Sequence, residues 1–268
     1  MNLQDRVVVI TGAGSGIGRA TALLFAKHGA RIAACDVDQA RLDSLAIELG
    51  DRKLVVRRVD VSDRAQMSAF AGAVHALAPA ADIIVNNAGV GLGGTFLDTS
   101  LDDFDWIIGV NLRGVIHGCH FFVPNMVEAK RGGHVINISS ILGIYGAPSV
   151  TAYVATKFAV RGFSESLRAE LEPFHIGVTA ICPGMINTAI VEDGRMRGER
   201  LVQGKGRAAK LFKKKGLAPE KVAAEIFEAV QSNPAVRTVG RDAHVIAALQ
   251  RFAPRALRKI GTRISGRI

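Results

Sequence analysis

The sequence predicts a doubly wound α/β fold, in which one parallel sheet carries helices on both of its faces. Short apolar runs alternate with longer amphipathic stretches from residue 7 to residue 181, and this alternation is typical of parallel strands joined by crossover helices. The runs are apolar throughout rather than at every second residue, as expected of strands buried on both faces. A turn with four glycines joins the first run to the first amphipathic stretch. We therefore expect a single domain of this class.

The predicted elements follow one another in alternation. The first strand is the run VVVIT, and the first helix follows the glycine turn directly. The second strand ends at Asp36, and Asp38 is well placed to cap the helix that follows. Strands are expected at 7–11, 31–36, 54–59, 82–86, 134–139 and 176–181, and helices at 17–28, 38–49, 63–78, 101–129 and 151–174.

The net charge of +10 is unevenly placed along the 268 residues. Residues 1–194 hold 16 Lys and Arg against 19 Asp and Glu, whereas residues 195–268 hold 18 against five. A nucleic-acid-binding module would be basic throughout, so we expect no nucleic-acid partner.

Cysteine usage and hydropathy indicate a cytoplasmic protein. Cys35, Cys119 and Cys182 lie far apart and have no metal-ligand spacing, so they predict buried thiols in a reducing compartment and no metal site. The first residues are too polar for a signal peptide, so we expect none. The uncharged run 135–156 carries too many polar, glycine and proline residues to span a membrane.

The glycine turn TGAGSGIG, residues 11–18, has the features of a phosphate-binding turn. Glycines let the backbone approach a pyrophosphate, and the helix that follows presents free N–H groups and the positive end of its dipole. The spacing departs from the GxGxxG fingerprint because Ile17 stands at its sixth position. No GxxxxGK[ST] pattern is present, so a nucleoside-triphosphate loop is not supported.

Asp36 predicts a preference between two related cofactors. A carboxylate at the end of the second strand can accept hydrogen bonds from the adenosine ribose of NAD, and it would repel the 2′-phosphate of NADP. Its sequence neighbours, Cys35 and Val37, are uncharged, as is Ser15 in the turn. We therefore expect NAD to be preferred over NADP, although a role of Asp36 in capping the next helix fits the same residue.

Tyr153 and Lys157 are spaced four residues apart at the start of a predicted helix, which places them on one helix face. A nearby cation favours the phenolate and lowers the pKa of a tyrosine, which could then exchange a proton with an alcohol or ketone. Ser140 follows a buried strand and could hold the reacting oxygen. Asn111 lies in the long helix at 101–129, where a structural role is the simpler interpretation.

Together these residues resemble the short-chain dehydrogenases/reductases. The resemblance covers residues 4–190 and, less clearly, 217–240. The motifs that carry it are TGAGSGIG (11–18), Asp60-Val61, NNAG (86–89), Asn111, Ser140, YVATK (153–157) and PGMINT (183–188).

The resemblance implies a role for each matched position. Tyr153 matches the general acid/base, Ser140 the substrate-orienting hydroxyl, and Lys157 the residue that binds the nicotinamide ribose and lowers the pKa of the tyrosine. Asn111 matches a helix-kink residue that holds a water in a proton relay through Lys157. Cofactor contacts are implied at Gly12, Ser15, Gly16, Ile17, Gly18, Asp36, Asp60, Val61, Asn87, Ala88, Gly89, Tyr153, Lys157, Pro183, Gly184, Ile186 and Thr188.

The expected function is hydride transfer between a nicotinamide cofactor and a secondary alcohol or ketone. The segments outside the motifs offer an apolar lining, which favours a lipid-, steroid- or terpenoid-like substrate. That lining comprises Val90, Leu92, Phe96, Ile141, Leu142, Tyr145, Met185 and Ile190. The alternative is a non-catalytic NAD-binding sensor or scaffold.

Residues 1–240 are expected to form a Rossmann-like dehydrogenase domain, with a mobile substrate lid at about 189–216. Residues 241–268 form a basic amphipathic tail, in which Pro254 should break the helix. The tail could pack on the domain or a second subunit, or it could contact an anionic membrane surface. The resemblance implies a homo-oligomer, either a dimer or a tetramer.

Overall fold

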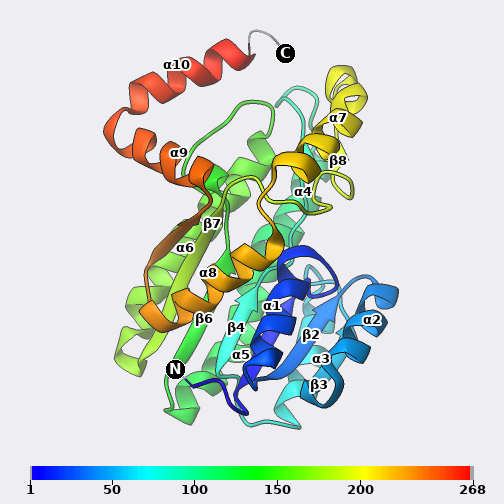
Figure 1. Cartoon of the computed structure of the whole chain (residues 1–268), viewed down its shortest axis with the longest axis vertical. Coiled ribbons are helices and arrows are strands. Elements are labelled where there is room, and N and C mark those ends of the chain that lie inside the picture. The colour runs from blue at the N-terminus through cyan, green and yellow to red at the C-terminus, as the bar shows by residue number, and fades with distance from the viewer. Residues whose placement is uncertain (1, 266–268) are drawn as a thin grey trace.

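The computed structural model describes residues 2–265 of the chain and the side chains of residues 2–259. Seven parallel strands form one sheet in the order β3-β2-β1-β4-β6-β7-β9, and helices cover both faces (Figure 1). The strands are β1 (Val7–Thr11), β2 (Arg31–Asp36), β3 (Lys53–Arg58), β4 (Ile83–Asn86), β6 (Gly133–Ile138), β7 (Ile176–Pro183) and β9 (Val236–Val239). This arrangement confirms the predicted fold class.

Two apolar layers sandwich the sheet. On one face, Phe25 of α1 and Ile226 of α8 belong to a buried cluster that Leu45 of α2 joins. On the other face, Phe70 of α3 and Phe122 of α5 pack edge-to-face at 6.0 Å between ring centroids, and α6 completes that layer. The helices of the domain are α1 (Gly16–Lys27), α2 (Gln39–Leu49), α3 (Arg64–His75), α4 (Leu101–Ile108), α5 (Gly114–Ala129), α6 (Thr151–Leu171) and α8 (Pro219–Ser232).

The outer strands differ from the expectation of full burial. Strand β3 has only half-buried and exposed residues, and β9 buries only Val239. Each lies at an edge of the sheet and so has one neighbour instead of two. The inner strands β1, β4, β6 and β7 are buried along their whole length, as predicted.

Several elements were not predicted. The segment expected to be a mobile lid contains the short strand β8 (Arg195–Met196), which pairs with β5 (Leu92–Gly93), and the 17-residue helix α7 (Glu199–Lys215). Helix α8 and strand β9 were also missed. The long predicted helix at 101–129 is continuous, but the turn Gly109–Arg113 is π-helical.

The basic tail forms two helices. Helix α9 (Arg241–Phe252) is capped by Ala253, and α10 (Pro254–Ser265) begins at the proline that was expected to break the helix. Leu257 is buried, whereas Val245 and Phe252 are exposed, so the predicted apolar stripe does not lie on one buried face. Ile260 and Arg263 lie outside the described side chains, and Arg267 lies outside the described residues. No helix in the described part of the chain is long and apolar enough to cross a bilayer.

Candidate active site

The predicted site residues come together at the carboxyl edge of the sheet. The strand order changes direction between β1 and β4, and a crevice at such a switch point is the usual ligand site of open α/β sheets. The glycine turn follows β1, Asp36 ends β2, Asn87 follows β4, Ser140 follows β6, and the 183–188 loop follows β7.

The glycine turn is packed too closely for side chains. Gly12 has φ +63°, and a Cβ there would lie 2.7 Å from the Cα of Ala88. Ser15 is the N-cap residue of α1, and its hydroxyl makes no capping bond within the described chain. The free N–H groups of α1 and this hydroxyl therefore suit the pyrophosphate of a dinucleotide. Gly16 also places the turn beside Thr188, because its Cβ would lie 3.0 Å from Thr188 Cγ2.

Asn87 braces the turn from the next strand. Its Nδ2 donates to the carbonyls of Thr11 and Gly12 at 2.9 and 3.0 Å. The Thr11 hydroxyl accepts hydrogen bonds from the backbone N–H groups of Asn87 and Ala88, both at 3.1 Å. The Asn87 side chain is thus engaged with the turn itself, and Thr11 is a supporting residue that the sequence did not point to.

Asp36 lies against the turn, as the cofactor argument requires. Its Oδ2 accepts from the N–H of Gly14 at 2.8 Å, and its Oδ1 accepts from the N–H of Asp38 at 3.0 Å. Asp38 caps α2 by accepting from Arg41 N–H, as predicted. The surroundings of Asp36 were expected to be uncharged, but Arg41 lies close to it. A Cβ on Gly14 would lie 2.9 Å from both Arg41 Cβ and Asp36 Cγ, so Gly14 is in contact with both residues.

Arg41 is neutralised by two carboxylates, and it borders a hollow beside the turn. It pairs with Asp38 at 3.1 Å and with Asp193 at 3.2 Å. The hollow measures about 490 Å³ and is lined by Gly14, Ser15, Gly16, Arg19, Asp38, Ala40, Arg41 and Ser44. The proximity of Arg41 to Asp36 could not be predicted from the sequence neighbours of Asp36, because the first turn of α2 separates the two residues in the chain.

Asp60 and Val61 follow β3 and are held locally. Asp60 Oδ1 accepts from the Ser62 N–H and hydroxyl at 2.9 and 2.7 Å. Val61 is buried, and a Cβ on Gly114 would lie 2.6 Å from Val61 Cγ2. Both residues therefore lie in the turn between β3 and α3, and Val61 packs against α5.

Asn111 occupies the π-helical turn and is fully buried. Its Oδ1 accepts from Val90 N–H at 2.8 Å, and its Nδ2 donates to the Val90 carbonyl at 3.0 Å. A Cβ on Gly89 would lie 3.3 Å from Asn111 Oδ1 and 3.5 Å from Lys157 Nζ. Asn111 therefore fixes the chain after β4 and lies close to Lys157. The helix is irregular at this residue, because Gly109–Arg113 is π-helical.

Ser140, Tyr153 and Lys157 form one cluster at the start of α6. The Ser140 hydroxyl lies near enough to the Tyr153 phenol to act on the pKa of that phenol. Lys157 Nζ donates to the Ile138 carbonyl at 2.9 Å and lies 5.6 Å from the centre of the Tyr153 ring. The Ser139 hydroxyl donates to the Lys157 carbonyl at 2.8 Å, which ties α6 to the end of β6.

The expected lowering of the pKa of Tyr153 is not found in this arrangement. Burial raises the pKa of Tyr153 to about 12, and the nearby Ser140 hydroxyl opposes that rise. Burial also lowers the pKa of Lys157 to about 8. The lysine points at a backbone carbonyl instead of the phenol oxygen, so its charge does little for the phenolate. At neutral pH the phenol is therefore the protonated form, which is a proton donor.

The loop after β7 is fixed by the first turn of α9. Met185 N–H donates to Asp242 Oδ2 at 2.7 Å, and Gly184 N–H donates to the Val239 carbonyl at 2.9 Å. Asp242 was placed in the tail by the sequence, yet it holds the loop that contains Pro183, Gly184, Ile186 and Thr188. Its role depends on a contact between distant segments, which spacing along the chain does not reveal.

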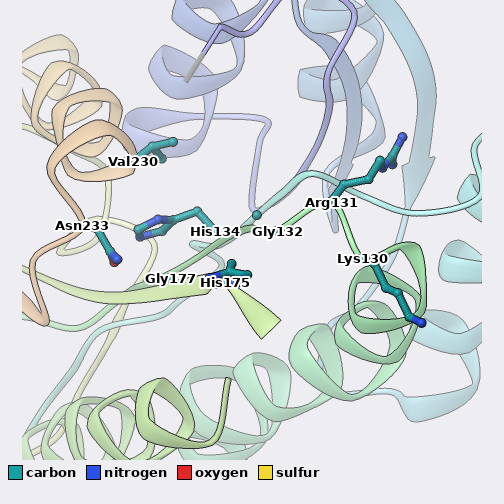
Figure 2. A pocket seen from close by; sticks show the side chains of 9 residues that line it. Lys130, Arg131, Gly132, His134, His175, Gly177, Val230 and Asn233 are labelled. Carbon is teal, nitrogen blue, oxygen red and sulfur yellow. The ribbon is translucent and has the colours of Figure 1, made fainter. Parts of the chain in front are cut away.

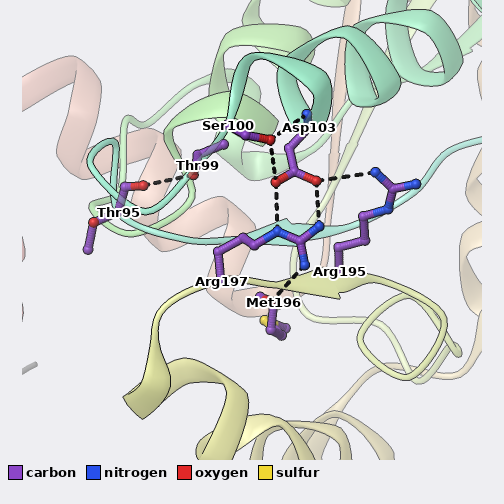
Figure 3. Close-up of polar contacts among 7 residues, drawn as sticks. All are labelled: Thr95, Thr99, Ser100, Asp103, Arg195, Met196 and Arg197. Carbon is purple, nitrogen blue, oxygen red and sulfur yellow. Dashed lines mark hydrogen bonds and ion pairs between the residues drawn. The ribbon is translucent and has the colours of Figure 1, made fainter.

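A buried carboxylate ties the start of the lid segment to α4. Asp103 is 2% exposed and accepts from Arg197 Nε at 2.6 Å, from Arg197 Nη2 at 2.7 Å and from Arg195 Nη1 at 3.2 Å (Figure 3). The Arg195 guanidinium also stacks on Trp106 at 3.9 Å from the ring centre. The hydrogen bonds from Arg197, then those from Ser100 and Arg195, lower the pKa of Asp103 to about 2 against the effect of burial.

A second hollow lies at the opposite edge of the sheet, where β6 and β7 begin (Figure 2). It measures about 420 Å³ and includes Lys130, Arg131, His134, His175 and Asn233 in its lining. Burial lowers the pKa of His134 to about 4, so the imidazole is neutral. This hollow contains none of the predicted site residues.

The strand order and the helices on both faces define a Rossmann-like fold, and comparison with known proteins supports this class. Residues 6–197 match the family model described as short chain dehydrogenase. The chain therefore belongs to the short-chain dehydrogenase/reductase family. The structure superposes with a TM-score of 0.86 on a family member from Burkholderia phymatum in complex with NAD, which is 31% identical over 94% of each chain.

Two curated relatives illustrate the range of the family. The chain is 41% identical over 261 residues to the probable oxidoreductase EphD of Mycobacterium tuberculosis (strain ATCC 25618 / H37Rv), covering 95% of this chain but only 44% of that protein. The chain thus spans less than half the length of this relative. It is 35% identical to the C alpha-dehydrogenase of Sphingobium sp. (strain NBRC 103272 / SYK-6), covering 94% of this chain and 88% of that protein.

Proposed function

We propose that the protein transfers a hydride between a nicotinamide cofactor and a secondary alcohol or ketone, with Tyr153 as the general acid/base. The observation that carries this proposal is the cluster of the Ser140 hydroxyl, the Tyr153 phenol and the buried Lys157 at the start of α6. Two adjacent hydroxyls can both contact one substrate oxygen, and a protonated phenol is the form that donates to a ketone. A sensor or scaffold would not need this arrangement.

The cofactor supplies or accepts the hydride when it is bound. Tyr153 donates its proton to the ketone oxygen during reduction, or removes the hydroxyl proton during oxidation. Ser140 donates a hydrogen bond to the same oxygen and so positions the reacting carbon. Lys157, which lies beside the Tyr153 ring, would hold the nicotinamide ribose of the bound cofactor.

The proposed preference is for NAD over NADP. Asp36 carries a buried carboxylate bonded to the phosphate turn, and it would oppose a 2′-phosphate. The positive charge of Arg41 would attract a 2′-phosphate and so weaken the preference for NAD. That charge is already compensated by ion pairs with Asp38 and Asp193.

The proposed substrate is apolar around its one reacting oxygen. Val90, Phe104 and Trp106 pack in the same apolar cluster as Tyr153, which suits a hydrocarbon ring or chain. Leu92 and Ile141 are buried in the core, and Phe96 is 65% exposed, so these three do not support the lining expected from the sequence. We further propose that the lid, residues 189–216, closes over the substrate from its fixed end at Arg197.

The proposed assembly is a homo-oligomer in a reducing compartment. Ile116 of α5 and Phe158 of α6 leave apolar side chains exposed on the domain surface, which supports pairing of subunits there. Cys35, Cys119 and Cys182 are buried free thiols, which supports an environment without disulfide formation. Light scattering after gel filtration would test the assembly.

Titration of the purified protein with NADH and NADPH, followed by nicotinamide fluorescence, tests the cofactor. A screen of apolar secondary alcohols with NAD then tests the reaction, with Tyr153→Phe as the decisive variant. We expect this variant to keep NADH affinity and to lose activity by a factor of about 10² to 10⁴. Unchanged activity in Tyr153→Phe, or no binding of either cofactor by folded protein, contradicts the proposal.

A further inference from the structure

Exposed apolar side chains gather on the segments around the mouth of the site. Thirteen large apolar residues are exposed among the described side chains, and seven lie on the loop before α4, the first residue of α4, helix α7 and helix α9. These seven are Phe96, Leu97, Leu101, Val202, Leu211, Val245 and Phe252. Leu97 is 93% exposed and Phe252 is 79% exposed, which is unfavourable for side chains of this size in water.

These segments lie at one end of the molecule. Helices α7 and α10 both stand beyond the carboxyl edge of the sheet (Figure 1). Strand β5, just before the exposed loop, pairs with β8, and Gly94 bridges to Val150 at the start of α6. The segments that expose apolar side chains therefore lie at the end of the sheet that carries Ser140 and Tyr153, and we refer to this end as the mouth of the site. We call this end, made by residues 94–101, 199–215 and 241–259, the mouth surface.

The mouth surface is also strongly basic. All 17 residues of α7 are exposed or half-buried, and the exposed ones include Arg207, Lys210, Lys213, Lys214 and Lys215. Arg251 and Arg255 are exposed on the tail helices. The positive charge of the chain is concentrated here, because residues 1–194 carry three more acidic than basic residues.

The combination of positive charge and exposed apolar side chains distinguishes between three binding partners for the mouth surface, namely a second copy of the chain, a nucleic acid and an anionic bilayer. A second copy joined by a two-fold axis would bring the same basic surface against this one, and the two would repel. A nucleic acid would leave the aliphatic side chains in water. The interface of an anionic bilayer takes both, since apolar side chains enter the acyl boundary while Lys and Arg meet the headgroups.

We infer that the mouth surface docks the protein on an anionic lipid bilayer, with α7 and the tail helices in the headgroup layer. Docking of this kind turns the mouth of the site toward the membrane. This inference rests on the proposed function and makes the substrate class more specific. The substrate would be a lipid alcohol or ketone dissolved in the membrane, which can enter the apolar lining without crossing water.

Vesicle flotation with the full chain tests the docking. We expect the protein to float with vesicles of equal parts phosphatidylcholine and phosphatidylglycerol, and to stay behind with phosphatidylcholine alone. Added salt should weaken the binding, because exposed charges are screened. The variant Lys210→Glu/Lys213→Glu/Lys214→Glu should lose binding by at least about tenfold.

A matched variant separates docking from net charge. Lys27, Lys53 and Lys130 are exposed at the ends of α1, β3 and α5, at the opposite edge of the sheet. The variant Lys27→Glu/Lys53→Glu/Lys130→Glu changes the net charge equally and should keep its vesicle binding. Equal loss in both triple variants, or no flotation of the wild type with anionic vesicles, overturns the inference.

NADH binding of each variant, measured without vesicles, reports on folding and on the proposed function separately. Both triple variants should bind NADH as the wild type does. A protein that floats with anionic vesicles but neither binds NADH nor oxidises any alcohol would overturn the proposed function and leave the docking intact.

Discussion

Arg197 and Asp103 form a two-bond ion pair between the lid and α4, with Nε–Oδ2 at 2.6 Å and Nη2–Oδ1 at 2.7 Å. The two residues are 94 positions apart in the chain, and the Asp103 side chain is buried while the Arg197 side chain is 40% exposed. A bidentate pair fixes direction as well as distance. The pair therefore holds Arg197 against α4, and we expect closure of the proposed lid to move only the residues that follow Arg197.

Replacing Asp103 by Asn should loosen the lid without disturbing the cofactor. The amide keeps the size of the carboxylate but removes the charge that Arg195 and Arg197 share. We expect KM for the substrate to rise by about tenfold, with NADH affinity unchanged. Steady-state kinetics measures the first and fluorescence titration the second. Asp102→Asn, at the exposed neighbour in α4, is the control and should leave both values unchanged.

The same pair predicts how stability depends on acid. The folded pKa of Asp103 is about 2, below the ordinary value near 4. Its contribution to the free energy of unfolding is therefore present above pH 4 and is lost as the pH falls toward 2. Urea unfolding between pH 5 and pH 3 should show a smaller loss of stability for Asp103→Asn than for the wild type. Equal pH dependence would contradict this assignment.

Lys157 should be costly to the fold at neutral pH. Its folded pKa of about 8 lies below its ordinary value, so the unfolded chain binds more protons and stability should rise with pH from about 8 to about 10.5. Lys157→Met removes the buried charge, which gains about 3 kcal/mol, and loses the hydrogen bond to Ile138, which costs about 1 kcal/mol. We expect the variant to be inactive and more stable at pH 7 in urea unfolding, with a smaller advantage at pH 9.5.

The glycine turn should tolerate no side chain at residue 12. Gly12→Ala combines a positive φ with a Cβ 2.7 Å from Ala88 Cα, so we expect lower stability and at least about tenfold weaker NADH binding. Gly72→Ala is the control, since that helical residue has no described atom within 4 Å of its Cβ position. It should raise the unfolding temperature, because alanine favours helix by about 1 kcal/mol.

Asp36→Ala should reduce discrimination between the two cofactors. Without the carboxylate, the 2′-phosphate of NADP meets less repulsion, and Arg41 remains nearby. We expect the ratio of NADH to NADPH affinity to fall by about tenfold or more. Asp43→Ala on the exposed side of α2 is the control. A ratio unchanged by Asp36→Ala would remove the basis for the proposed NAD preference.

The sequence predicted the parts of this molecule whose signal is local. Strands β1 and β2 were predicted at their observed bounds, and Tyr153 and Lys157 were paired by their spacing on one helix. Helix α8 also carries a local signal, because Val222, Ile226 and Val230 recur every four residues and are buried. That signal was overlooked.

Other features had no local signal. Helix α7 contains Gly204 and Gly206 and buries no described side chain, so its apolar pattern is weak. Asp103, Arg197 and Asp242 act through partners on distant segments. The pKa of Tyr153 was expected to fall because of Lys157, but burial dominates once the side chains are placed. Spacing predicts which residues can meet, whereas burial and partners decide their chemistry.

The order of strands in the sheet also governs how the chain is made. Strand β1 pairs with β2 and with β4, so Val8 meets Ile83 only after the segments between them have left the ribosome. Synthesis proceeds at about 5 to 20 residues per second, so one edge of β1 stays open for several seconds. Pairings of such long range also form slowly on refolding. An open apolar strand edge favours association between nascent chains, and recovery from denaturant should therefore fall as protein concentration rises.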